Sequence, residues 1–343
     1  MSDTGQPLVS VSLVTYNGIR WVDACLDSVI AQTHRPIEVI VLDNGSSDGT
    51  PDRVAARAGA GSALKLIRST ENLGFAAAHN RVIDVAKGAF VCLLNQDVIL
   101  DPGFLAGAVQ AFEADPGAAA VQGRLYRLGP GLERTTTFDT TGLQMHRNRR
   151  IVSRGQGQED VGQFDQPGLV FGADGPAPVY RAVALRDVTV PRAGGRTEVL
   201  DEDFFMYKED VDLAWRLLLF GWHAAYVPSA IAWHARGAGA SAMSTIGLAR
   251  ERQRLPSWIK CRSWTNQRWM QVKNELAPLV GRDFGHILWK EVRALAFLAA
   301  FETRCLSAFP RFVRGLPAAR RKRAYVMAHR RRDANEMAAW FDR

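Results

Sequence analysis

The sequence predicts an α/β protein in which helices flank a mostly parallel central sheet. Apolar, β-branched runs alternate with helical patterns along the first third of the chain, which is typical of a parallel sheet covered on both faces. The 343 residues include 47% hydrophobic and 23% charged side chains, enough for a sizeable core. Four widely spaced cysteines without a CxxC pair do not support a disulfide scaffold or a zinc ribbon, and they favour a reducing compartment.

Each predicted element follows from a local pattern. The strands are short runs rich in Val, Ile and Leu that end in polar turns, and the helices carry apolar residues at helical spacing. In chain order we predict a strand at 8–14, a helix at 21–30, a strand at 37–42, a helix at 51–60, a strand at 65–68, a helix at 75–86 and a strand at 90–94. Residues 124–170 are Gly-rich and loosely patterned, so we expect an irregular insertion that shapes a substrate site.

Polar loops follow three of the predicted strands, at residues 15–17, 43–48 and 95–97. The carboxyl ends of parallel strands meet at one edge of a sheet, where open α/β sheets bind their ligands. We therefore expect these loops to line a common crevice. The first loop begins TYNG and lacks the G-x-G-x-x-G fingerprint, which argues against a nicotinamide or flavin enzyme.

Four acidic residues and one histidine have both a chemical and a structural interpretation. Asp43 ends a strand, where it either accepts hydrogen bonds from a ribose or a base or forms a turn. Asp97 follows an apolar strand, where it either helps to hold a divalent cation on phosphates or ends the strand. Glu209 and Asp210 lie in the first turn of a predicted helix. A carboxylate there either acts as a base on a substrate hydroxyl or interacts with the helix dipole. His234 is a candidate metal ligand or phosphate contact, with a structural role as the alternative.

Seven stretches of the sequence, taken in order, carry a resemblance to a known family. They are VSLVTYN, VIVLDNGSSDGT, ENLGFAAAHN, LLNQDVILDPGFL, FGADGPAPVYR, DEDFFMYKEDVDLAWRLLLFGW and YVPSAIAWH. They extend from residue 8 to about residue 240, roughly two-thirds of the chain. On these stretches the chain resembles the family 2 glycosyltransferases with the GT-A fold. Within them it resembles the rhamnosyltransferase-like branch of bacterial polysaccharide and cell-wall synthesis.

The resemblance implies roles for individual residues. Asp210 stands where the family keeps its catalytic base, and Asp97 and His234 match positions that hold a divalent metal, Mg²⁺ or Mn²⁺. Asn95 replaces the first acid of the family's DxD motif, and Asp174 stands where relatives often have a small residue. The residues implied in nucleotide-sugar binding are Thr15, Tyr16, Asn17, Asp43, Asp48, Asn72, Asn95 and Gln96. Those implied on the acceptor side are Gly172, Asp174 and Glu209.

The reaction implied by the resemblance is an inverting glycosyl transfer. L-Rhamnose is the expected sugar, dTDP-rhamnose is the favoured donor, and a glycan or a lipid-linked saccharide is the acceptor. The acceptor hydroxyl loses its proton to Asp210 and attacks the anomeric carbon from the face opposite the diphosphate. The alternative is a catalytically inactive member that binds nucleotide sugar and serves as a scaffold of a polysaccharide-assembly complex.

Charge divides the chain into two parts. Residues 1–240 form the expected catalytic domain, with a nucleotide-sugar half to about residue 123 and an acceptor half from about residue 124. Residues 241–343 contain 21 Lys and Arg against 8 Asp and Glu, a net charge of +13 in a chain of net +8. The pattern of this basic part predicts helices, including an amphipathic helix near residues 288–306.

The basic part is either a peripheral contact with an anionic membrane, which we assign to residues 310–343, or a helical cap. Such a cap packs on the catalytic domain or forms a homodimer. Its runs at 320–323 and 330–332 accompany no recognised nucleic-acid motif, so we expect no nucleic-acid partner. No signal peptide is evident, and the apolar run at 294–301 is too short to span a bilayer. We expect a cytoplasmic protein, located at the inner face of the plasma membrane if it contacts lipid.

Overall fold

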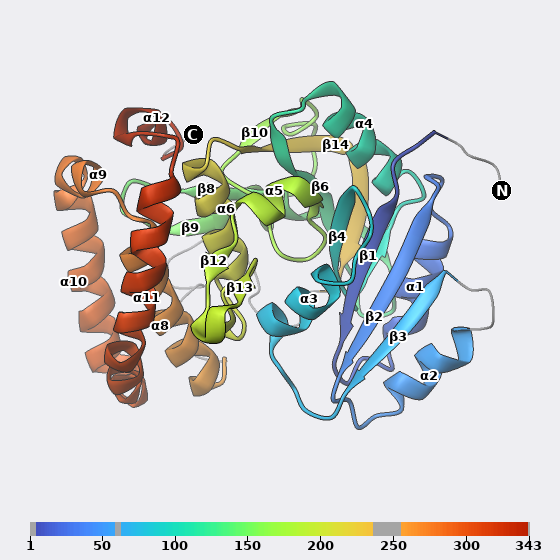
Figure 1. Ribbon diagram of the computed structural model, residues 1–343, viewed down its shortest axis with the longest axis horizontal. Helices are drawn as coiled ribbons and strands as arrows, with labels where there is room; N and C mark the ends of the chain where they lie inside the picture. Colours follow the sequence, from blue (N-terminus) through green and yellow to red (C-terminus); the bar gives the residue numbers. More distant parts are fainter. Residues whose placement is uncertain (1–4, 59–62, 236–254, 342–343) are drawn as a thin grey trace.

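The computed structural model describes residues 5–58, 63–235 and 255–341. Its centre is a mixed sheet that begins with β1 (Val9–Thr15), β2 (Ile37–Asn44), β3 (Leu64–Ser69) and β4 (Phe90–Asn95). These strands run parallel in the order β3-β2-β1-β4 (Figure 1). β1 and β4 are almost completely buried, as expected of central strands covered on both faces. The predicted parallel sheet is confirmed.

Helices cover both faces of this sheet, as the sequence predicts. They are α1 (Val22–Ile30), α2 (Thr50–Arg57), α3 (Phe75–Ile83), α4 (Phe104–Ala114) and α6 (Glu209–Leu219). One face packs against α1, α2 and α4 through an apolar cluster that includes Leu26, Val54 and Phe104. The opposite face packs against α3 and α6 through a second cluster that includes Ala76 and Trp215.

The sheet continues beyond β4 with strands from later in the chain. In spatial order they are β11 (Val179–Arg181), β6 (Ala118–Leu128), β14 (His223–His234) and β10 (Gly168–Val170), with β5 (Val98–Leu100) on β14 and β7 (Arg134–Thr140) on β6. β14 runs parallel to β6, whereas β11, β10, β5 and β7 pair antiparallel to their neighbours. The β5–β14 register sets Val98 opposite His234, which brings the ends of two distant segments together.

The irregular insertion predicted at residues 124–170 is wrong in part, because much of this segment forms strands. It contains part of β6, all of β7 and β10, and a hairpin of β8 (Leu143–Met145) and β9 (Ile151–Ser153). These strands are short or polar, and pairing with distant segments stabilises them more than any local pattern does. The short elements before α6 are α5 (Ala182–Asp187), β12 (Val190–Pro191), η1 (Ala193–Gly195), β13 (Thr197–Glu198) and η2 (Glu202–Phe204).

The C-terminal part is helical, as predicted. Its elements are α8 (Ser257–Asn274), α9 (Ala277–Arg282), α10 (Phe284–Phe301), η3 (Thr303–Ala308), α11 (Phe309–His329) and α12 (Ala334–Ala338). α8 and α11 pack against each other and share an apolar cluster with α6, whereas α10 lies at the outer edge of the molecule (Figure 1). The boundary expected after residue 240 lies outside the described residues.

Several side chains of the Arg-rich runs of the C-terminal part make contacts within the chain. Lys322 is buried among acidic side chains, and Arg323 donates to two backbone carbonyl groups at the end of α8. Arg331 pairs with Asp187, and Arg332 donates to carbonyl groups at the end of α6. These side chains therefore belong to a helical cap on the sheet domain. Within the part of the chain that the structure describes, no helix is long and apolar enough to cross a membrane.

Candidate active site

The three loops expected to meet at the carboxyl edge of the sheet do so. Thr15 and Asp43 are neighbours in the β1–β2 register, and Thr15 Oγ1 donates to Asp43 Oδ1 at 3.1 Å. The other oxygen of Asp43 accepts the backbone N–H of Ser46 at 3.1 Å. Asp43 is buried, so these two bonds hold its carboxylate in one orientation at this edge.

Tyr16, Asn17 and Gln96 connect the loops to one another. Gln96 Oε1 accepts the backbone N–H of Tyr16 at 2.9 Å, and Gln96 Nε2 donates to the Tyr16 carbonyl group at 3.1 Å. Asn17 has a left-handed backbone with φ of 48°, and its side-chain oxygen accepts the N–H of Ser47 at 2.9 Å. The Tyr16 side chain is exposed, and its backbone follows Thr15, the partner of Asp43 in the β1–β2 register.

Asp48 and Asn72 bind the backbone of the same loops. The Asp48 carboxylate accepts the N–H groups of Ile19 at 3.0 Å and Thr50 at 3.1 Å. The Asn72 side-chain oxygen accepts the N–H of Gly74 at 2.9 Å. Asp48 also accepts the hydroxyl group of Thr50, and Asn72 also accepts the side-chain amide of Asn44 at 3.2 Å. Both residues therefore fix loop shape through contacts within the chain.

β5 and the end of β14 place a carboxylate beside an imidazole. Asp97 Oδ1 lies 3.4 Å from His234 Nε2, and His234 Nδ1 donates to Asp139 Oδ2 at 2.8 Å. Burial by itself lowers the pKa of His234, but the hydrogen bonds to Asp139 and Asp97 outweigh it and raise that pKa to about 9. The ring is therefore fixed between two acids.

The spacing of Asp97 and His234 fits a divalent cation that displaces the proton from His234 Nε2. Two ligands bound at about 2.1 Å to one ion stand roughly 3 Å apart or slightly more, close to the observed separation. A carboxylate on the second ring nitrogen, here that of Asp139, is the arrangement that orients a metal-binding histidine. In residues 5–58, 63–235 and 255–341 no group of three or more His, Cys, Asp or Glu is arranged to hold a metal. This pair therefore suits an ion that takes its other ligands from phosphates and water, as Mg²⁺ does.

A second acidic cluster lies on the loop before β11 and at the start of α6. The Gly175 N–H is shared by two carboxylates, at 3.0 Å from Asp174 Oδ1 and 3.2 Å from Asp210 Oδ2. One oxygen of Asp174 and one of Glu209 are buried without a hydrogen-bond partner in the described part of the chain. These acids line a cavity of about 350 Å³. The N–H of Asn95 donates at 2.9 Å to the carbonyl group of the residue after Gly175, so the cluster adjoins the end of β4.

Two acids of this cluster, Asp210 and Glu209, have raised but different pKa values. Burial raises the pKa of Asp210 to about 6, and the Asp174 carboxylate adds to this effect while Lys208 opposes it. Burial and the charge of Asp210 raise the pKa of Glu209 to about 8. Of Glu209 and Asp210, Asp210 is therefore the one that is ionised near neutral pH, with a pKa suited to accepting a proton from a substrate.

Activity that needs ionised Asp210 is expected to fall as the pH drops through about 6, because protonation removes the base. Asp174→Asn removes a neighbouring negative charge, which favours ionised Asp210 and lowers its pKa. The acid limb of kcat/KM against pH should then move to lower pH. An acid limb that stays in place in the Asp174→Asn variant contradicts this coupling.

Gly172 lies between the acidic cluster and the core. A Cβ at this position would stand 2.1 Å from the Cβ of Ala214 on α6, so the glycine permits close packing of the helix on this loop. Its carbonyl group accepts the N–H of Leu143 at 2.8 Å. Gly172 therefore sets the position of the helix that carries Asp210.

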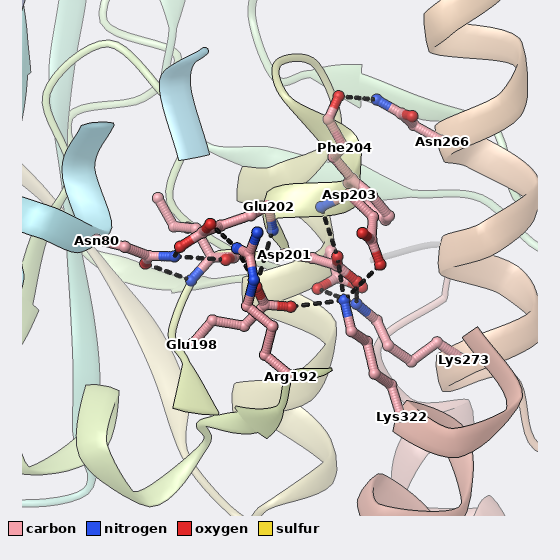
Figure 2. Close-up of polar contacts among 12 residues, drawn as sticks. Asn80, Arg192, Glu198, Asp201, Glu202, Asp203, Phe204, Asn266, Lys273 and Lys322 are labelled. Atoms are coloured by element: carbon pink, nitrogen blue, oxygen red, sulfur yellow. Dashed lines mark hydrogen bonds and ion pairs between the residues drawn. The ribbon is translucent and has the colours of Figure 1, made fainter. Parts of the chain in front are cut away.

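The segment that leads into α6 is fixed by the C-terminal helices (Figure 2). Lys273 of α8 pairs with Asp201 and, at 2.8 Å, with Asp212. Lys322 of α11 pairs with Asp201 and two further acids of the same segment. Asn266 donates to the carbonyl groups of residues 204, 206 and 207 at 2.8 to 3.0 Å. The helix that carries the candidate base is therefore anchored by side chains from the C-terminal part.

A sequence profile of glycosyl transferase family 2 matches residues 10–186, slightly more than half of the chain. The chain belongs to this family. It is also 32% identical over 249 residues to an N-acetylglucosaminyl-diphospho-decaprenol L-rhamnosyltransferase of Mycobacterium tuberculosis, across 66% of this chain and 76% of the relative. The family recognised from the sequence, including its rhamnosyltransferase-like branch, is confirmed.

This family 2 glycosyltransferase is similar in fold to solved enzymes. A mannosyltransferase of Pyrobaculum calidifontis, in complex with GDP-Man and Mn²⁺, superimposes with a TM-score of 0.53 at 19% identity, across 95% of this chain and 86% of that chain. GalNAc-T7, with UDP, GalNAc and Mn²⁺, superimposes with a TM-score of 0.54 at 12% identity, across 89% of this chain and 59% of that chain. These likenesses confirm the GT-A fold.

Sequence reasoning missed several residues that organise the site of this glycosyltransferase. Asp139, which binds His234, lies in a polar strand without a motif. Lys273 and Lys322 lie in helices whose charges suggest an exposed basic face, yet both are buried. Their neighbours offer the one usable signal, because Lys273 follows the buried residues Trp269 and Met270 at helical spacing.

Proposed function

We propose that this family 2 glycosyltransferase is an inverting enzyme that transfers L-rhamnose from a nucleoside diphosphate to a saccharide of cell-wall polysaccharide synthesis. One observation carries the proposal. A partly buried carboxylate with a pKa of about 6, Asp210, lines a cavity whose loop is bonded to the end of β4, two residues before Asp97 in the chain. A base and a metal site are the two groups that glycosyl transfer from a diphosphate requires. The relative named as an L-rhamnosyltransferase supports the choice of sugar.

The donor lies, in this proposal, along the carboxyl edge of the sheet. Asp43 and Thr15 offer fixed hydrogen-bonding groups for the nucleoside, and the exposed ring of Tyr16 offers a surface for stacking. Asn17 and Gln96 keep the loops in place for it. The remaining residues of this side shape the loops or flank the phosphates, namely Asp48, Asn72 and Asn95. dTDP-rhamnose is the donor that we favour.

The transfer proceeds in one displacement. Asp210 accepts the proton of the acceptor hydroxyl, whose oxygen forms a bond to the anomeric carbon from the face opposite the diphosphate. The bond between that carbon and the diphosphate oxygen breaks, and the nucleoside diphosphate leaves. Asp97 and His234 would hold a divalent ion, which would supply positive charge to this leaving group. The catalytically inactive scaffold is the less favoured reading, since such a protein has no need of a carboxylate tuned to proton transfer.

Asp97→Ala is expected to abolish the metal dependence of both donor binding and transfer, because it removes the carboxylate of the two-residue metal site. Calorimetric titration of dTDP-rhamnose with and without Mn²⁺ measures the first effect, and release of dTDP measures the second. Asp84→Ala, at an exposed position after α3, is the matched control. A normal Mn²⁺ titration curve in the Asp97→Ala variant contradicts the assignment.

The acceptor of this proposal is a glycan or a lipid-linked saccharide, and the reaction takes place at the cytoplasmic face of the plasma membrane. Contact with anionic lipid was expected of residues 310–343. Because Lys322, Arg331 and Arg332 bind groups within the chain, we instead assign any lipid contact to α10, whose apolar side chains are exposed. A homodimer through the C-terminal helices is the competing use of this surface.

A further inference from the structure

Helix α10 carries large apolar side chains that no described element covers. Of its 18 residues, all of them described, only Leu298 is buried. Trp289 and Phe301 are 65% and 64% exposed, and Phe284 and Leu295 are also more than half exposed. The helix stands outermost among the C-terminal helices (Figure 1). A contiguous apolar surface on an exposed helix indicates an interaction site.

A groove leads from this helix to the candidate base. Two cavities of about 490 and 610 Å³ adjoin each other between α8, α10 and the β8–β9 hairpin, and we call them together the α10 groove. Arg150 lines both of them and also the cavity that contains Asp174 and Asp210. Lys208 and Ser263 line the first cavity and the cavity of the base. The groove therefore adjoins the cavity of the candidate base.

Positive charge predominates along the α10 groove. Glu302 is the one acid among its described lining residues, and it is buried. Arg149 is neutralised by two acids, but no described acid pairs with Arg150 or Arg293, and both are exposed. The cationic residues that line the groove are Arg149, Arg150, Lys208, Arg268, Lys290 and Arg293. Guanidinium groups favour phosphate oxygens, because they donate several hydrogen bonds at once.

We propose that the α10 groove binds the diphosphate and the lipid chain of a polyprenyl-diphosphate-linked acceptor. The lining side chains change along the groove in the same order as the saccharide, diphosphate and lipid parts of such an acceptor. Asp210 meets the saccharide, Arg150 and Arg293 meet the diphosphate, and the apolar side chains of α10 meet the lipid. This inference rests on the proposed function and specifies its acceptor.

Farnesyl diphosphate is a suitable probe, and Trp264 and Trp289, which line the groove, report its binding through tryptophan fluorescence. The full-length chain is titrated in EDTA, so that the diphosphate does not bind through a metal at Asp97. Arg150→Gln combined with Arg293→Gln should weaken binding by about tenfold or more, because two charge-assisted contacts are lost. Inorganic pyrophosphate and farnesol, each lacking half of the probe, should bind more weakly than farnesyl diphosphate.

The matched control combines Arg320→Gln with Arg321→Gln, which removes the same charge from exposed positions of α11 outside the groove. It should bind the probe as the wild type does. The proposal is overturned if the two double variants bind alike, or if farnesol binds as tightly as its diphosphate. A further result would overturn it. If binding of the chain to phosphatidylglycerol vesicles falls in the Arg150 and Arg293 double variant as much as binding of farnesyl diphosphate does, the groove recognises anionic lipid in general.

Donor titration with Mn²⁺ on the same variants separates this proposal from the one it rests on. Retained donor binding together with loss of the probe confirms an acceptor groove distinct from the donor site. A wild-type chain that binds no nucleotide sugar contradicts the proposed function. Equal probe binding by both double variants, with donor binding intact, contradicts the groove alone.

Discussion

Asp210→Asn is expected to reduce glycosyl transfer by about 100- to 10,000-fold, the usual contribution of a general base. The amide keeps the shape of the side chain but does not accept the proton of an acceptor hydroxyl. Donor binding should remain, because the nucleoside loops lie at the ends of β1 and β2 and share no described contact with Asp210. Rates of dTDP release with acceptor, and donor titration, measure the two effects.

The same variant should be folded and at least as stable as the wild type at neutral pH. The pKa of Asp210 is raised in the folded chain, so stability is lost as the pH rises from about 4 to about 6, and the neutral amide avoids that loss. Asp84→Asn, at an exposed position, controls for the loss of one charge. Normal turnover by Asp210→Asn would show that another group is the base.

Lys273→Met is expected to lower the free energy of unfolding by about 3 to 5 kcal/mol, the usual effect of removing one partner of a buried ion pair. Lys273 is buried and pairs with Asp201 and Asp212, so its loss leaves these acids with fewer cations in a dry environment. Transfer activity should also fall under conditions where the variant is still folded, because Asp212 lies on the helix that carries Asp210.

Lys65→Met, on the exposed side of β3, is the control for replacing a lysine by methionine. Urea unfolding of the two variants and the wild type gives the free energies, provided that the slopes agree. If Lys273→Met is as stable as Lys65→Met and fully active, the C-terminal helices do not anchor the active site through this lysine.

The first half of the fold was predictable because its signals are local. β1, β2 and β4 are apolar runs that end in polar turns, and a helix separates each strand from the next between β1 and β4. The strands within residues 124–170 were not predictable in the same way. β7 reads RTTTFDT, and its stability comes from pairing with β6 and not from its own pattern.

The residues of the candidate site also differ in whether local sequence signals predict them. Asp97 and Asp210 follow directly from strand ends and a helix start, together with the family resemblance. Asp139 and Lys273 join the site only through tertiary contacts, with His234 and with Asp201, and no spacing in the sequence encodes those contacts. The same is true of the α10 groove, since the sequence predicts an amphipathic helix but not which of its faces stays exposed.

The central claim is that this chain binds a nucleotide sugar through a metal at the carboxyl edge of its sheet. Calorimetric titration with dTDP-rhamnose, UDP-glucose, UDP-galactose and GDP-mannose, each with and without Mg²⁺ or Mn²⁺, tests it most directly. We expect metal-dependent binding of one donor, dTDP-rhamnose, and weaker or no binding of the others. Binding of none of the four, with either metal, would contradict the claim.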